Sequence, residues 1–175
     1  MILTQDEGLS FFKMYLPLLH FAYSRKHYVN FNKFKSTGIR DKIVAQKILF
    51  DKIQLIDEYL SKVKLNDKTV KDIFEIKKHR KSKFIILKHL SQYSVFMDMN
   101  NRNKLYGVIG LTDEFFEILP FFPIMIHGVI FNFRNKLVCD GLITNENIQF
   151  GPGIRKDLNR EYKELKAKKG VSLIL

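Results

Sequence analysis

The spacing of hydrophobic positions changes once along the chain. Through residue 83 they recur with the period of an α-helix, and from residue 84 they form short β-rich runs separated by polar turns. This pattern predicts an α+β protein, in which an N-terminal helical half, residues 1–83, packs on a mainly antiparallel sheet, and the region 84–175 ends in a closing helix. Because no Gly/Ser- or Pro-rich linker divides the two regions, we expect one structural unit.

Three helices are expected in the first half. The first covers about residues 5–26, and a capping-box pattern begins at Thr4. Residues 27–38 mix aromatic residues, asparagines and lysines without a steady period, which predicts a connection. A second helix follows over 39–63 and a third over 67–78.

The second half predicts strands, a short helix and a hairpin. Strands are expected within 84–99 and 105–111, and a short helix capped by Thr112 follows over 113–119. The hairpin is expected around Arg134-Asn135, a candidate two-residue turn, because asparagine tolerates a positive φ.

A glycine-containing turn precedes the closing helix, which we expect over 154–168 with Gly170 as its stop. A loop of this kind before a helix can bind phosphate on helix amides. Neither a GxxxxGK[ST] nor a GxGxxG pattern is present, and Pro152 removes one amide, so the sequence favours a simple turn.

Cys139 is the only cysteine, and it alternates with Leu137 on one face of the predicted hairpin strand. This position favours a buried structural side chain over a nucleophile. The alternative is an enzyme with a site near the 127–141 hairpin, using Asp140 with His127 or Cys139. The histidines lack the spacing of a metal site, and no motif predicts a cofactor.

The formal net charge of +12 is concentrated in one stretch, since residues 25–83 hold 17 Lys or Arg against 7 Asp or Glu, 17 − 7 = +10. Such a concentration attracts phosphate or an acidic surface, although an excess of lysine over arginine is also what an AT-rich coding sequence produces. Three aromatic residues, Tyr28, Phe31 and Phe34, lie among these lysines and suit stacking with single-stranded nucleic acid. The candidate binding residues lie toward the two ends of this stretch: Arg25, Lys26, Lys77, Lys78, Arg80, Lys81 and Lys83.

The most apolar stretch, from Leu9 to Tyr23, is 15 residues long and contains Lys13 and Pro17. A membrane span needs about 20 mostly apolar residues, so we expect no membrane partner. One cysteine cannot form an internal disulfide, which favours the reducing cytoplasm.

The chain from Lys104 onward resembles a pattern found in an uncharacterised bacterial protein family. The similarity lies in KLYGVIGLTDEFFEILPFFP, in CDGLI within the hairpin, and in IQFGPGIRKDLNREYKELKAKKG. The resemblance implies a bacterial origin and a recurrent fold. It carries no activity and transfers no catalytic residue, and Cys139 stands where the pattern has a tyrosine.

These observations favour a non-catalytic bacterial binding or regulatory module whose basic segment contacts an acidic partner, either nucleic acid or an acidic protein. The first alternative is a protein–protein interaction domain whose charge serves solubility. The second is the enzyme at the 127–141 hairpin.

Overall fold

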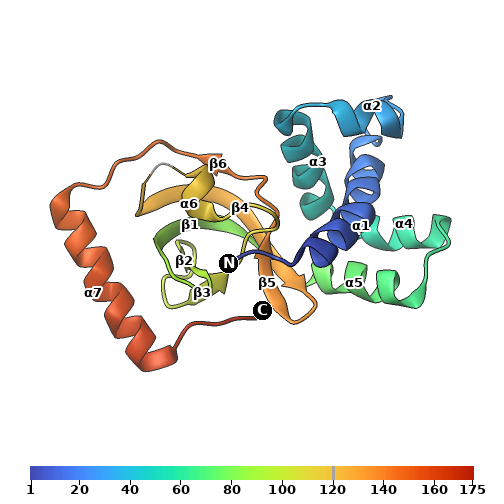
Figure 1. Cartoon of the computed structure of the whole chain (residues 1–175). Coiled ribbons are helices and arrows are strands. Elements are labelled where there is room, and N and C mark those ends of the chain that lie inside the picture. The colour runs from blue at the N-terminus through green and yellow to red at the C-terminus, as the bar shows by residue number, and fades with distance from the viewer. Residues whose placement is uncertain (120) are drawn as a thin grey trace. The chain divides into compact units, whose positions relative to one another are not determined.

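The computed structural model describes residues 1–119 and 121–175 and divides the chain into two compact units (Figure 1). Thr4–Lys78 form the helical unit, and Met1–Leu3 together with His79–Leu175 form the sheet unit. The predicted α+β class is confirmed, since helices fill the first half and an antiparallel sheet and a C-terminal helix follow. Each unit is described below by itself.

Five helices form the helical unit: α1 (Gln5–Tyr23), α2 (Phe31–Ser36), α3 (Ile39–Asp51), α4 (Leu55–Lys62) and α5 (Asp67–Lys77). The capping box at the start of α1 is confirmed, because the Glu7 amide donates to Thr4 Oγ1 at 3.3 Å and the Thr4 amide donates to the Glu7 carboxylate at 3.0 Å. α1 packs against all four other helices through buried residues such as Phe11 and Leu18. It is therefore the central helix of this unit.

Two predictions for the helical half were wrong. Residues 27–38 contain α2, which is capped by the Asn30 side chain accepting from the Lys33 amide at 2.9 Å; a helix this short leaves no periodic signal. The helix predicted over 39–63 is two helices, separated where Lys52 leaves the helical conformation with φ −133° and ψ 66°. The apolar rhythm continues across this break, so the pattern did not reveal it.

The described residues of the sheet unit form six strands and two helices: β1 (His79–His89), β2 (Ser94–Asp98), β3 (Leu105–Val108), α6 (Phe115–Ile118), β4 (Ile124–Phe133), β5 (Lys136–Cys139), β6 (Thr144–Asn145) and α7 (Pro152–Lys169). The strand order is β3-β2-β1-β4-β5, with β6 paired to β4, and all these pairs are antiparallel. The sheet begins at His79, so part of the basic run 77–83 belongs to a strand.

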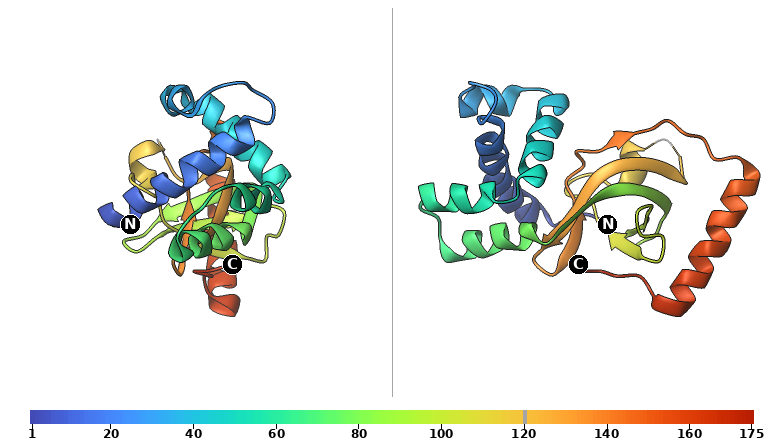
Figure 2. Two further views of the ribbon diagram at one scale, coloured as in Figure 1. Left: turned by 90° about the vertical axis from the view of Figure 1, so that its right-hand side faces the viewer. Right: turned by 180° about the vertical axis from the view of Figure 1, so that it is seen from behind.

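The sheet is strongly curled, as the bent β1 and β4 show (Figure 2). Its two outer strands are joined beyond β3, because the Ile109 amide donates to the Leu137 carbonyl at 3.0 Å and the Cys139 amide donates to the Ile109 carbonyl at 3.1 Å. The curl therefore links both edges of the sheet, which leaves fewer free backbone groups for association with other strands.

The two faces of the sheet carry separate clusters of buried residues. The α6 face includes Phe84, Phe96, Tyr106, Ile130, Leu137 and Cys139, with Phe115 of α6 packed among them. The α7 face includes Ile85, Val95 and Met97, which Leu158 and Tyr162 of α7 cover. The prediction that Cys139 and Leu137 share a buried face is confirmed.

The predicted hairpin turn is confirmed, because Arg134 and Asn135 adopt φ 49° and 61° between β4 and β5. The predicted cap of the short helix was wrong. Glu114 caps α6 and forms a capping box with Glu117, whereas the Thr112 hydroxyl donates to Asp113 Oδ2 at 2.7 Å. α7 begins at Pro152, two residues before the predicted start, and Gly170 ends it with φ 72°.

Candidate functional site

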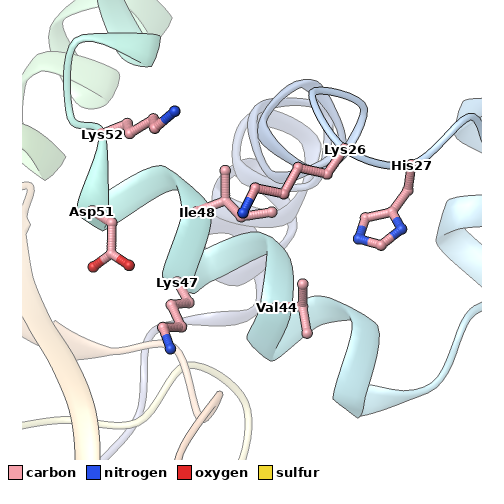
Figure 3. Close-up of a pocket in the computed structure, with 7 residues that line it drawn as sticks. All are labelled: Lys26, His27, Val44, Lys47, Ile48, Asp51 and Lys52. Atoms are coloured by element: carbon pink, nitrogen blue, oxygen red, sulfur yellow. The ribbon is translucent and has the colours of Figure 1, made fainter.

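The leading candidate site is a basic pocket of the helical unit, with a volume of about 390 Å³ (Figure 3). We call it the lysine pocket, and it is lined by Lys26, His27, Val44, Lys47, Ile48, Asp51 and Lys52. Of the seven residues predicted from the sequence to bind an acidic partner, Lys26 is one that lines this pocket.

Two segments build the lysine pocket. Val44, Lys47, Ile48 and Asp51 lie at positions i, i+3, i+4 and i+7 of α3, so they share one face of that helix (Figure 3). Lys26 and His27 come from the turn that follows α1. A helix therefore provides a rigid wall, and the turn brings two further polar side chains to it.

The turn after α1 is held in place by contacts on both sides of the pocket residues. His20 Nε2 donates to the Val29 carbonyl at 2.7 Å, and the His27 ring stacks on the Tyr23 ring with centroids 4.2 Å apart. The Tyr23 hydroxyl donates to Asp41 Oδ1 of α3 at 2.9 Å, and this bond raises the pKa of Tyr23. The contacts fix the turn relative to α3.

The lysine pocket is positively charged. Within residues 1–119 and 121–175, no carboxylate forms an ion pair with Lys26, Lys47 or Lys52. Asp51 is the acidic residue of the lining, against three lysines. A ligand that supplied negative charge would therefore gain attraction that the chain itself does not satisfy.

The three aromatic residues predicted to accompany the basic segment have different environments. Tyr28 directly follows His27 and is fully exposed, at 108% of the reference area, whereas Phe34 is completely buried. Phe31 is partly buried and contacts the His20 ring at 5.5 Å. Of the three rings, Tyr28 is thus the one exposed for stacking, and in the sequence it directly follows the pocket residue His27.

Four of the other predicted basic residues are held by carboxylates. Lys77 Nζ lies 2.8 Å from Asp57 Oδ1, and Arg25 pairs with Glu58. In the sheet unit, Arg80 pairs with Asp98 and Lys83 pairs with Glu146. The remaining two, Lys78 and Lys81, are exposed.

Arg80 belongs to a polar cluster around a buried carboxylate. Asp98 is completely buried and accepts from Arg80 Nε at 2.6 Å, from the Ser82 hydroxyl at 2.5 Å and from the Asn100 amide at 2.9 Å. Because a buried charge is costly without a partner, Arg80 serves here to neutralise Asp98.

His127 has a carboxylate partner that the sequence did not suggest. It lies opposite Lys83 on neighbouring strands, and both side chains contact Glu146 Oε1, with Lys83 Nζ at 2.7 Å. Their hydrogen bonds lower the pKa of Glu146, with Lys83 as the larger cause, so this carboxylate stays ionised. The arrangement can hold His127 in one orientation at the surface of the sheet unit.

The other two residues of the enzyme alternative have structural roles. Cys139 is 1% exposed, and burial raises the pKa of its thiol, which keeps it in the unreactive protonated form. Cys139 belongs to the α6 face, whereas His127 alternates with Ile126 of that face and so points the other way. Asp140 Oδ1 accepts from the Leu142 amide at 3.1 Å.

Among the residues that the structure describes, no helix is long and apolar enough to span a bilayer. Within the same residues, no three side chains of His, Cys, Asp or Glu are grouped so that they could hold a metal ion.

Comparison with protein-family models, with curated proteins and with solved structures found no match to this chain.

Proposed function

We propose that this protein is a non-catalytic binding or regulatory module that binds single-stranded nucleic acid through the lysine pocket. The observation that carries the proposal is the grouping of Lys26, Lys47 and Lys52, without ion-pair partners, around one pocket. The exposed Tyr28 directly follows the pocket residue His27 in the sequence. We place the function in the cytoplasm, because the single buried thiol suits a reducing compartment.

Charge supports the first part of the proposal. Phosphates bound by lysines release condensed counterions, which is the main source of affinity in sequence-independent nucleic-acid binding. Lysines already paired with carboxylates contribute less, because the partner must first be displaced. The unpaired lysines of the pocket are therefore favoured over Lys77 and Lys83, which already have partners.

Tyr28 supports the choice of a single strand. Exposed aromatic rings next to a basic groove bind single strands by stacking on bases, and this stacking contributes about 1–3 kcal/mol per base. In a duplex the bases stack on one another, so their faces are not accessible to a tyrosine ring.

The test is binding of a fluorescein-labelled single-stranded RNA to the full chain across a salt series. The pocket variant carries Lys26→Gln, Lys47→Gln and Lys52→Gln, and the matched control carries Lys64→Gln, Lys68→Gln and Lys71→Gln, three exposed lysines of the same unit. We expect the pocket variant to reduce the slope of log K against log salt by about 2, at roughly 0.7 per phosphate contact. The control should retain most of the slope.

A second variant separates stacking from charge. Tyr28→Ala should weaken binding by roughly 5- to 150-fold at fixed salt and leave the salt slope unchanged. Phe74→Ala, which removes another exposed ring of the helical unit, is its control. Equal losses in the pocket and control variants would assign binding to overall charge and overturn the proposed site. Absence of binding at low salt would favour the protein–protein interaction alternative.

A further inference from the structure

The sheet unit contains a second basic pocket, between β1 and α7, with a volume of about 200 Å³. We call it the α7 pocket, and it is lined by Leu87, Lys88, Pro123, Arg155, Leu158, Asn159 and Tyr162. We propose that the α7 pocket binds the phosphoryl group of a small phosphate monoester. The site is independent of the lysine pocket and of the nucleic-acid proposal.

A β-bulge brings Lys88 into the α7 pocket. In a regular strand Lys88 would point to the same face as Ile86, because side chains alternate. The register shifts between Ile86 and Lys88, so that Ile86 lies opposite Phe96 and Lys88 lies opposite Val95. Lys88 consequently joins Val95 on the α7 face and reaches the Tyr162 ring, with Nζ 4.2 Å from the ring centroid.

Arg155 is positioned by a hydrogen bond from Nε, which leaves its two terminal nitrogens available to bind a ligand. Its Nε donates to the Phe150 carbonyl at 2.8 Å, which fixes the guanidinium at the start of α7. Its terminal nitrogens donate no hydrogen bond within residues 1–119 and 121–175. Two parallel N–H groups of arginine match two phosphate oxygens, and this geometry is the reason that arginine is preferred in such sites.

The acidic residues of α7 do not neutralise this pocket. Asp157 pairs with Arg160 at 2.8 Å, and Glu161 pairs with Arg102 at 2.8 Å. Among the described residues, Lys88 and Arg155 have no carboxylate partner, and the lining contains no acidic side chain. The pocket therefore holds two uncompensated positive charges.

Tyr162 adds a neutral donor. The residue is only 6% exposed, yet within the described chain its hydroxyl makes no hydrogen bond. It lies one helical turn from Asn159, and Arg155, Asn159 and Tyr162 follow at i, i+4 and i+7 along the same face of α7. A phosphoryl group in the pocket can accept from all three side chains.

The size and walls of the pocket limit the ligand. Binding sites for drug-sized molecules are commonly about 300–1,000 Å³, so this pocket holds a phosphoryl group and a few further atoms. Leu87, Leu158 and Pro123 form apolar walls that suit the carbon atoms next to the ester oxygen. A monoester is favoured over a diester because its second negative charge matches the second cation.

The experiment titrates the full ¹⁵N-labelled chain with ribose 5-phosphate, inorganic phosphate or dimethyl phosphate and follows backbone amide shifts at constant ionic strength. We expect saturable shifts at Lys88, Arg155 and Asn159 with the monoester, and at least tenfold weaker binding of the diester. Inorganic phosphate should shift the same amides but bind more weakly than ribose 5-phosphate. If inorganic phosphate binds at least as tightly, the pocket does not recognise the sugar part of a monoester, and the proposed ligand is wrong. Lowering the pH from 7.5 to 5.5 should weaken monoester binding, since the second phosphate pKa is about 6.

Variants test the named residues. Lys88→Gln and Arg155→Gln should each weaken monoester binding at least tenfold, and Lys163→Gln, an exposed lysine of α7 outside the pocket, should leave it unchanged. Tyr162→Phe should weaken binding several-fold without lowering the unfolding midpoint, because the hydroxyl has no partner to lose. Shifts spread over all basic surfaces, or equal losses in Lys163→Gln, would overturn the site.

Discussion

At the residue scale, burial decides what Cys139 can do. The thiol lies in the α6 face at 1% exposure, and desolvation raises its pKa above the ordinary value of 9.0. Below pH 9 the thiol is protonated in both the folded and the unfolded chain, so it adds no pH dependence to stability. Above pH 9 only the unfolded chain releases the proton, and the free energy of unfolding falls as the pH rises.

The wild-type chain should therefore lose about 1 kcal/mol of stability between pH 9 and 10 through this group, because the unfolded thiol is only half ionised at pH 9. Urea unfolding at pH 8, 9 and 10 measures the loss, and Cys139→Ala serves as the reference because its tyrosines and lysines are unchanged. Cys139→Ala starts less stable because it truncates a buried side chain, so the wild-type advantage over it should shrink as the pH rises. Parallel pH profiles would show that the thiol ionises in the folded state and is not buried as described.

The sequence predicted Cys139 correctly, because strand alternation assigns a side chain to a face. It did not find Lys47 or Lys52 as pocket residues, since both lie outside the apolar rhythm of the predicted helix and so resemble ordinary solvent-exposed lysines. That they line one pocket with Lys26 depends on how the turn after α1 packs on α3. Single-residue patterns contain no information on such a long-range contact.

At the element scale, α2 depends on a side chain from another helix. Six residues are too few for a stable isolated helix. The Lys42 ammonium of α3 donates to the Phe34 carbonyl at 2.6 Å, the Thr37 carbonyl at 3.0 Å and Thr37 Oγ1 at 2.9 Å. Burial lowers the pKa of Lys42, although Asp41 opposes this shift. The hydrogen bonds to the end of α2 offset the cost of partly removing the Lys42 ammonium from water.

Replacing this ammonium should unfold α2 locally. Lys42→Met should cost about 2 kcal/mol, which lies within the range for hydrogen bonds to a charged group. Hydrogen exchange should show faster exchange of the Phe34 and Thr37 amides, with α1 little changed. Arg40→Met on the same helix is the control, and equal acceleration in both variants would mean that α3 itself had been weakened.

Some elements were predictable because their signal is local. The turn at Arg134-Asn135 requires residues that tolerate positive φ, and the capping box at Thr4 needs only four residues. The bulge in β1 and the break at Lys52 were not predictable, because neither contains glycine or proline. Both changes bring lysines to the two proposed pockets.

At the scale of the whole molecule, the two units share the net charge more evenly than the excess in residues 25–83 suggested. The helical unit holds 15 Lys or Arg and 9 Asp or Glu, 15 − 9 = +6, and the sheet unit holds the same numbers. The difference arises because the sheet unit includes Arg80, Lys81 and Lys83, which the sequence had grouped with the helices. Two separate basic pockets, one in each unit, are consistent with this division.

The units should also respond separately to a local clash. A Cβ added at Gly110 would lie 2.2 Å from the Asp113 carbonyl oxygen, so Gly110→Ala must displace the turn that pairs with Ile2. We expect a loss of about 1–3 kcal/mol in the sheet unit, typical of overpacking. Hydrogen exchange should show faster opening of β2 and β3, with α1 and α3 unchanged.

Gly38→Ala is the matched control, because an added Cβ there has nothing within 4 Å. Faster exchange in α1 and α3 of the Gly110→Ala chain would show that the two units unfold as one cooperative body. Such a result would support the expectation, drawn from the missing linker, that the chain forms a single structural unit.

The pairing of Ile2 with Gly110 also orders events during synthesis. During synthesis, Met1–Leu3 and the whole helical unit leave the ribosome before the partner segment at Gly110 emerges. The helices can pack together while residues 1–3 have no strand with which to pair. Pairing residues 1–3 with the sheet must then close a loop that contains the folded helical unit. In nascent chains stalled before Gly110, residues 1–3 should therefore remain exposed and sensitive to protease.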